Sequence, residues 1–267
     1  MLDHSTRIAI RLACDAAAEV KRIYAGQFGV ETKADGSPVT DADKAANDII
    51  LAGLEEHFPE DNVLSEETPF DANRALGRRI WFIDPLDGTK DFVNRTGDFA
   101  VMIGLCVAGR PLIGVVAAPA LDTLWVGVVG QGAFEERDGV QRPLTISDTR
   151  EGPLRMLCSR SHRPPQIETL AERLGPAELH PRGSVGVKIS LLAAGEADLY
   201  LHPTAGTSLW DCCAPEAILR AAGGEFTKPD GSLITYDPMI TANPDGILAA
   251  GPTDHARAVS LLAESPA

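Results

Sequence analysis

Two aspartates three positions apart follow an apolar run in the first half of the chain. Residues 80–83 are apolar, and Asp84, Pro85, Leu86 and Asp87 come directly after them, followed by Gly88 and Thr89. The run predicts a buried strand, the proline a turn, and the Gly-Thr pair a helix start. Carboxylates bind hard cations such as Mg²⁺, and a helix start offers N–H donors to a phosphate. This stretch therefore predicts metal-assisted chemistry on a phosphate ester.

The alternative for the Asp-rich stretch is a turn with no further role, because Asp and Gly are ordinary turn formers. A second alternative is a phosphatase that uses a D-x-D pair, one Asp as a covalent nucleophile and the other as an acid. The spacing here is D-x-x-D, and no D-x-D-x-T follows a predicted strand. The spacing favours direct attack by a water that a metal activates.

Further carboxylates stand elsewhere in the chain. Glu66 follows a short apolar segment and could lie beside Asp84. Asp211 stands at the start of one predicted helix, and Asp41 and Asp43 at the start of another. Each of the three aspartates could do no more than cap its helix. Together, these carboxylates supply enough oxygen ligands for two or three divalent ions.

The elements that would position these residues follow from periodicity. Ile8, Leu12, Ala16, Val20 and Ile23 repeat at helical spacing and predict a helix over 5–24, and a second helix is expected over 41–58. Strands are expected at 80–83, 100–107, 112–117 and 123–128, between Gly and Pro signals. We expect helices packed on a mostly antiparallel sheet.

Beyond about residue 144, strands and helices alternate, which favours an α/β arrangement. Strands are expected at 156–158, 198–201 and 246–250, and helices at 165–174, 187–194, 211–222 and 254–263. The prediction is thus an N-terminal α+β lobe over 1–147, with most metal ligands, and a C-terminal α/β lobe over 148–267 with Asp211. No separable linker divides them, so we expect the site in the cleft between the lobes.

The motifs, taken together, resemble those of the magnesium-dependent, lithium-sensitive phosphomonoesterases of the inositol monophosphatase superfamily. In chain order they are T-D-x-D, S-E-E, W-x-x-D-P-L-D-G-T-K-D-F, S-R-S-H, G-S-x-x-x-K, A-D-L-Y and W-D before A-G-G. Order and spacing match over nearly the whole chain. The resemblance implies the layered α-β-α-β-α sandwich of the sugar-phosphatase fold and two or three Mg²⁺ ions in the active site.

The resemblance also implies roles for individual residues. The metal ligands would be four carboxylates and one backbone carbonyl, with one further carboxylate as a candidate for a third ion: Glu66, Asp84, Asp87 and Asp211, then Leu86, then Glu67. Gly88 and Thr89 would bind phosphate through backbone N–H groups. The Thr89 hydroxyl, paired with Asp43, would orient the attacking water, and Glu66 would act in catalysis with them.

The substrate prediction rests on departures from the inositol enzymes. These usually read T-T-N-F after D-G and carry a Glu shortly before W-D; here the chain reads T-K-D-F, and 202–208 holds no carboxylate. T-K-D-F, S-R-S-H and Gly183-Ser184 with Lys188 look instead like the 3′(2′),5′-bisphosphate nucleotidases. Those enzymes remove the 3′-phosphate of adenosine 3′,5′-bisphosphate and related sulfated nucleotides, giving AMP and phosphate.

A bisphosphate needs a second anion site, for which Lys188, Arg160 and His162 can present charge-assisted N–H groups, with Ser184 and Asp87 as further contacts. The alternatives are that Lys188 is a solvated lysine on a helix face and that His162 is a loop residue with only a local hydrogen bond. Residues 185–187 also differ from the G-S-S-x-K that the nucleotidases often have. An inositol 1-phosphatase or a sugar (fructose 1,6-bis)phosphatase remains the alternative activity. A catalytically inactive relative that binds a phosphorylated metabolite is the alternative of another class.

Composition narrows the class of partner. A net charge of −14 argues against a nucleic acid polymer as partner but permits a small phosphorylated metabolite, since bound Mg²⁺ inverts the local field. The five cysteines form no C-x-x-C pair, and the first residues lack the pattern of a signal peptide. The most apolar region, 111–129, is interrupted by Pro119 and Asp122 and predicts two strands and no membrane span. We expect a cytoplasmic monomer or homodimer.

Overall fold

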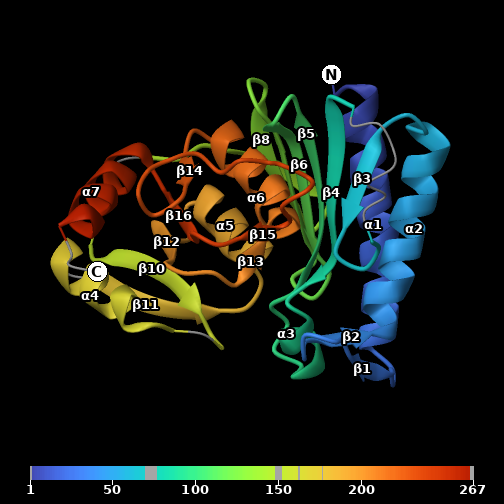
Figure 1. The fold of residues 1–267 in the computed structure, drawn as a ribbon, viewed down its shortest axis with the longest axis horizontal. Coiled ribbons are helices and arrows are strands. Elements are labelled where there is room, and N and C mark those ends of the chain that lie inside the picture. Colours follow the sequence, from blue (N-terminus) through green and yellow to red (C-terminus); the bar gives the residue numbers. More distant parts are fainter. Residues whose placement is uncertain (1, 70–76, 148–151, 162, 176, 265–267) are drawn as a thin grey trace.

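A computed structural model describes residues 2–69, 77–147, 152–161, 163–175 and 177–264. Helices and sheets alternate in five layers: a helix pair, a seven-stranded sheet, a second helix pair, a five-stranded sheet and a third helix pair (Figure 1). The layered α-β-α-β-α sandwich predicted from the motifs is confirmed. Within the described ranges, no helix is long and apolar enough to cross a membrane.

The outer helix pair consists of α1 (His4–Tyr24) and α2 (Asp41–His57). The predicted apolar stripe of α1 is buried along its whole length, against α2 and the large sheet. Asp3 caps α1 by accepting from Thr6 N at 2.7 Å. Helix α2 ends at His57, one residue before the predicted end, and Phe58 is its C-cap.

The large sheet has the strand order β3-β4-β5-β6-β7-β8-β9. Its bounds are β3 (Asn62–Ser65), β4 (Arg79–Asp87), β5 (Ala100–Val107), β6 (Arg110–Ala118), β7 (Thr123–Val128), β8 (Gly132–Arg137) and β9 (Val140–Leu144). Only β3 and β4 are parallel, so the predicted antiparallel character is confirmed. The sequence reading missed β3, β8 and β9 and placed the end of β4 four residues too early.

Three glycines lie side by side across the middle of this sheet and let a helix approach it closely. Gly104 on β5 pairs with Gly114 on β6, which pairs with Gly127 on β7. A Cβ at any of the three would collide with the residues of α6 (Leu209–Ala221) at Ala214 or Ile218. The glycine row thus fixes the helix that carries Asp211 directly against the sheet that carries Asp84.

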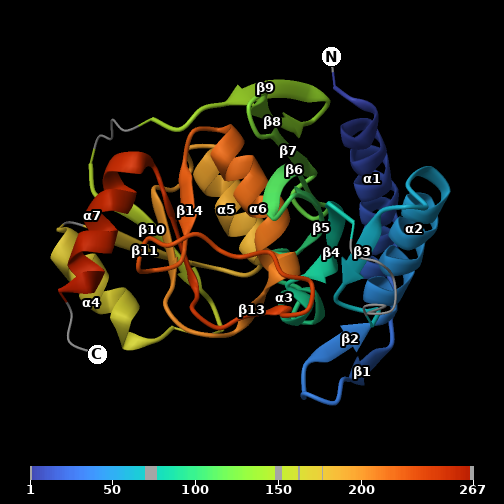
Figure 2. The same ribbon diagram turned by 45° about the horizontal axis from the view of Figure 1, so that its top comes forward.

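The second half of the chain forms the remaining layers. Helix α5 (Val185–Ala193) lies beside α6, and the sheet on the side of this helix pair away from the large sheet, to its left in Figure 2, has the order β11-β10-β12-β16-β14. Its bounds are β10 (Leu154–Ser159), β11 (Ala177–Arg182), β12 (Leu199–His202), β14 (Glu225–Thr227) and β16 (Ile247–Ala250), covered by α4 (Pro165–Leu174) and α7 (Pro252–Ala263). Strands β11, β10 and β12 are parallel, and β12, β16 and β14 are antiparallel.

Short elements connect the layers: the β1 (Val30–Thr32) and β2 (Pro38–Thr40) hairpin, α3 (Thr89–Val93), and the pair β13 (Thr207–Ser208) with β15 (Ala242–Asn243). One cluster of buried apolar side chains draws on both halves of the chain. The division into lobes at 147/148 stays a prediction.

Asp211, Asp41 and Asp43, whose alternative role was to cap a helix, are not the cap residues. Ser208 caps α6, which starts two residues earlier than expected, and Thr40 caps α2. Asp211 and Asp43 are each the third helical residue and accept from the backbone N–H of their cap residue at 2.7 Å. Both helices therefore begin with a capping box, in which a hydroxyl and a carboxylate satisfy each other's backbone donors.

Candidate active site

A β-bulge in β4 places Asp84 and Asp87 together. Residues three apart in a regular strand point to opposite faces. Here Asp84 pairs with Met102 and Asp87 with Ala100, so three steps on β4 match two on β5. The extra residue of the bulge turns both side chains to one face, where they are buried. The turn predicted after residue 83 is instead this irregularity within a continuing strand.

Asp211 joins this pair from α6. One carboxylate oxygen from each of Asp84, Asp87 and Asp211 lies within 4.8 Å of the other two. Burial, reinforced by the charges of neighbouring carboxylates, raises the pKa of Asp84 and of Asp211 well above the usual range. A buried, oxygen-only cluster of like charges needs a cation to offset it, and this donor chemistry fits Mg²⁺.

The orientation of Asp87 is set from α5. Its Oδ2 accepts hydrogen bonds from Ser184 Oγ at 2.6 Å and from Gly186 N at 2.7 Å. Burial raises the pKa of Asp87, and these two donors and Lys188 oppose the increase. These two hydrogen bonds hold the Asp87 carboxylate in its orientation beside the cluster.

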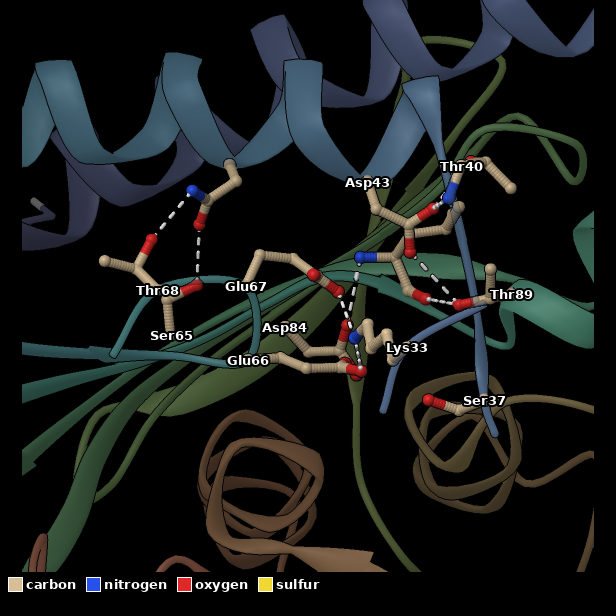
Figure 3. Close-up of polar contacts among 12 residues, drawn as sticks. Lys33, Ser37, Thr40, Asp43, Ser65, Glu66, Glu67, Thr68, Asp84 and Thr89 are labelled. Carbon is tan, nitrogen blue, oxygen red and sulfur yellow. Dashed lines mark hydrogen bonds and ion pairs between the residues drawn. The ribbon is translucent and has the colours of Figure 1, made fainter. Parts of the chain in front are cut away.

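Glu66 and Glu67 lie in a turn that follows β3. Asn47 on α2 holds this turn by accepting from Ser65 Oγ at 2.6 Å and donating to Thr68 Oγ1 at 3.0 Å (Figure 3). Glu66 N also donates to the Ile83 carbonyl at 3.1 Å. The turn is thereby attached both to α2 and to the strand that carries Asp84.

Lys33 makes an ion pair with both of these glutamates. Its Nζ lies 2.6 Å from Glu66 Oε1 and also donates to Glu67 (Figure 3). Burial alone would lower the pKa of Lys33, but the two carboxylates raise it above its usual value. Sequence reasoning missed Lys33, which lies between two short strands without apolar periodicity.

The predicted pair of Thr89 and Asp43 is in contact. Thr89 Oγ1 lies 3.1 Å from Asp43 Oδ1 and 3.1 Å from the Leu86 carbonyl (Figure 3). The other oxygen of Asp43 accepts from Thr40 N. Burial raises the pKa of Asp43, and the hydrogen bonds from Thr40 and Thr89 oppose that increase.

Several of these groups line a pocket of about 450 Å³. Predicted site residues that line it are Glu66, Asp87, Gly88, Thr89, Ser184, Lys188 and Asp211. Unforeseen lining residues include Ser37, Ser159, Ser161, Tyr200, His202 and Thr207. The structure therefore gathers residues from both halves of the chain around one cavity.

Lys188 is a buried residue of the pocket wall, which excludes the solvated alternative. Its side chain is 3% exposed, with Nζ 3.2 Å from the Gly183 carbonyl and 5.1 Å from the centre of the Tyr200 ring. Burial lowers the pKa of Lys188 to about 8, and the nearby aspartates oppose this decrease.

Arg160 and His162 had been predicted as substrate contacts. Arg160 donates to the carboxylates of Asp91 and Asp98. Among the described residues that line the pocket are its neighbours Ser159 and Ser161, but not Arg160 itself. His162 lies outside the described residues, so its role stays a prediction.

Comparison with known proteins identifies the family. The model of the inositol monophosphatase family matches residues 1–267. The chain is 38% identical to the 3′(2′),5′-bisphosphate nucleotidase CysQ of Escherichia coli K12, over 85% of this chain and 92% of that protein. It is 34% identical to the crystal structure of CysQ from Bacteroides thetaiotaomicron, described as a bacterial member of the inositol monophosphatase family, with a TM-score of 0.78 over 92% of this chain and 97% of that one.

A third comparison concerns the fold alone. The crystal structure of the extragenic suppressor protein suhB from Bartonella henselae has a TM-score of 0.85 at 23% identity, over 99% of this chain and 100% of that one. The chain belongs to the inositol monophosphatase family. The phosphatase class predicted from the motifs is thereby confirmed.

Proposed function

We propose that this chain is a Mg²⁺-dependent 3′(2′),5′-bisphosphate nucleotidase that removes the 3′-phosphate of adenosine 3′,5′-bisphosphate, leaving AMP and phosphate. The observation that carries the proposal is the buried carboxylate cluster beside a pocket with a buried lysine in its wall. The similarity to the CysQ proteins supports adenosine 3′,5′-bisphosphate as the substrate.

In this proposal Asp84, Asp87 and Asp211 would hold one Mg²⁺ ion, and Glu66, Asp84 and the Leu86 carbonyl another. Glu67 would be the ligand for a third. When bound, the ions would lower the pKa of the attacking water and neutralise charge on the phosphate oxygens. An ion on Glu66 must compete with the Lys33 ammonium, which is hydrogen-bonded to that carboxylate.

Thr89 and Asp43 would orient the water. Asp43 has a buried carboxylate, and the only proton of the Thr89 hydroxyl can be donated to it or to the Leu86 carbonyl. The lone pairs of Oγ1 would then accept a hydrogen bond from a water in the pocket and so orient it. Gly88, with φ 92°, caps α3 and would present the start of that helix to the phosphate.

Lys188 would bind the second phosphate of the substrate. An ammonium has three N–H donors. Two of these face the carbonyls of Arg182 and Gly183. The third is available to an anion, because Lys188 lines the pocket. A charge-assisted hydrogen bond in a buried site discriminates strongly against substrates that lack the second phosphate.

The test is phosphate release with Mg²⁺ from adenosine 3′,5′-bisphosphate, inositol 1-phosphate and fructose 1,6-bisphosphate. We expect kcat/KM to favour the nucleotide by about a hundredfold, or roughly 2.7 kcal/mol. Preference for inositol 1-phosphate would reject the substrate and keep the metal site. No Mg²⁺-dependent release from any of them would favour an inactive binding protein. The number of ions, the cytoplasmic location and the oligomeric state remain predictions.

A further inference from the structure

We propose that Arg160 is a positioning residue for the metal site: through Asp91 and Asp98 it holds the turn at Gly183 and Ser184 in the conformation that orients Asp87. This role differs from the substrate contact predicted from the sequence. The inference rests on the proposed function, because it concerns Asp87 as a ligand of Mg²⁺.

The turn is conformationally strained. Ser184 has φ 52° and ψ 127°, outside the regions that a residue with a side chain normally occupies. Such a conformation persists only where the surrounding structure enforces it, and it is found preferentially at functional sites. Its consequence here is that Ser184 Oγ and Gly186 N both point at Asp87 Oδ2.

Contacts from the D-G-T-K-D-F side of the pocket enforce this conformation. Gly183 N donates to Asp98 Oδ2 at 3.2 Å. The Asp91 carboxylate packs so closely on Gly183 that a Cβ there would collide with it. Two aspartates therefore fix the residue that precedes the strained serine.

Arg160 in turn fixes these two aspartates. Its guanidinium donates to Asp91 Oδ1 and to Asp98 Oδ2, while Arg182 Nη1 lies 3.0 Å from Asp98 Oδ1. Asp91 is 7% exposed and Asp98 1%, so both carboxylates need cationic partners to remain buried. The planar guanidinium donates to the two carboxylates through different nitrogens held in a fixed geometry, which a lysine ammonium does not reproduce.

The location of the network supports a role in the site. Arg160 follows the end of β10 and Arg182 ends β11, and these strands are parallel. Ligands of α/β sheets bind beyond the carboxyl ends of such strands. Asp91 belongs to the T-K-D-F motif and Arg160 to the S-R-S-H motif, 69 residues further along the chain. Their contact thus brings the two motifs together at the edge of the pocket.

A matched control separates positioning from stability. Arg155 on β10 forms an ion pair with Asp198 at 2.7 Å, and its side chain is 39% exposed against 36% for Arg160, which follows the same strand. Arg155→Met and Arg160→Met therefore each remove a partly exposed arginine that is paired with a carboxylate, one at the start of β10 and one just beyond its end. The sign of the effect is also informative: loss of a nearby positive charge alone would strengthen Mg²⁺ binding, whereas loss of positioning weakens it.

The experiment is calorimetric titration of the full chain with Mg²⁺, without substrate, for wild type, Arg160→Met, Arg160→Lys and Arg155→Met, with thermal unfolding in chelator alongside. We expect Arg160→Met to bind Mg²⁺ at least about tenfold more weakly, as is typical when a partner that orients a metal ligand is lost. The Mg²⁺ affinity of Arg160→Lys should lie between those of Arg160→Met and wild type. Arg155→Met should keep the wild-type affinity while losing about as much thermal stability as Arg160→Met.

Equal or stronger Mg²⁺ binding by Arg160→Met would overturn the inference, as would an equal loss in Arg155→Met. If Arg160→Met fails to fold, wild-type affinity in Arg160→Lys would overturn it. A wild-type chain that bound no Mg²⁺ would reject the metal site itself, and with it both proposals. Normal wild-type binding with an unaffected Arg160→Met rejects the positioning role alone.

Discussion

Neutralising one carboxylate of the metal site should stabilise the metal-free protein and remove its response to Mg²⁺. Asp84→Asn is the most direct change, because Asp84 is 2% exposed and lies against Asp87 and Asp211. Asparagine keeps the oxygen that accepts the Leu86 N–H at 2.9 Å, so the local backbone is preserved. The substitution removes charge with little change in shape.

The magnitude follows from the geometry. One carboxylate oxygen from each of Asp84, Asp87 and Asp211 lies within 4.8 Å of the others. Two unit charges at that limiting distance would repel by about 3.5 kcal/mol at an effective dielectric constant of about 20. Proton uptake relieves part of this repulsion in the metal-free chain, because burial raises the pKa of these carboxyls. We therefore expect Asp84→Asn to raise the free energy of unfolding of the metal-free chain by about 1–2 kcal/mol, or its Tm by roughly 2–8 °C.

The assay is thermal unfolding in chelator and in Mg²⁺ at one hundred times its measured Kd. Mg²⁺ should raise the free energy of unfolding of the wild type by about 2.7 kcal/mol, or its Tm by roughly 5–11 °C. It should raise the stability of Asp84→Asn only slightly. Glu135→Gln is the control: Glu135 is a buried carboxylate paired with Arg142 away from the pocket. It should lose stability in both conditions and keep the Mg²⁺ response. A metal-free Asp84→Asn variant less stable than wild type would show that charge repulsion at Asp84 does not destabilise the metal-free chain.

Further predictions concern catalysis, binding and pH. Thr89→Val removes the hydroxyl that contacts Asp43, so kcat should fall about a hundredfold while the calorimetric Kd for Mg²⁺ stays unchanged. Lys188→Met should raise KM for the bisphosphate about ten- to hundredfold in steady-state assays, and an unchanged KM would contradict its role. Lys33→Met removes a cation from Glu66 and should tighten Mg²⁺ binding about fivefold by titration. Because the pKa values of the clustered carboxyls are raised, the folded metal-free chain holds more protons than the unfolded chain above about pH 4. The free energy of unfolding of the metal-free chain should therefore fall as the pH rises through the pKa values of the folded chain. A metal-free Tm that rose from pH 5 to 8 would contradict this.

The sequence was most informative where local signals and chemistry coincide. The stripe of α1 and the antiparallel strands followed from periodicity, and the spacing of Asp84 and Asp87 correctly indicated that they lie together. Their physical arrangement differed, because a bulge and not a turn brings them to one face. A bulge depends on pairing with β5, which the residues of β4 alone do not reveal.

Contacts between distant segments were beyond sequence reasoning. The ion pairs of Lys33 with Glu66 and of Arg160 with Asp91 join segments far apart in the chain, and charged residues outside the apolar stripes carry no periodic signal. The helix starts, by contrast, could have been found. A hydroxyl residue at Thr40 or Ser208 followed three positions later by a carboxylate is the pattern of a capping box.

Identification of the product formed from adenosine 3′,5′-bisphosphate with Mg²⁺, by phosphorus NMR or chromatography, tests the proposed activity most directly. We expect AMP that retains its 5′-phosphate, together with one phosphate, and no turnover in Asp87→Asn although that variant folds. Adenosine 3′-phosphate as the product, or turnover by Asp87→Asn at saturating Mg²⁺, would contradict the proposed activity.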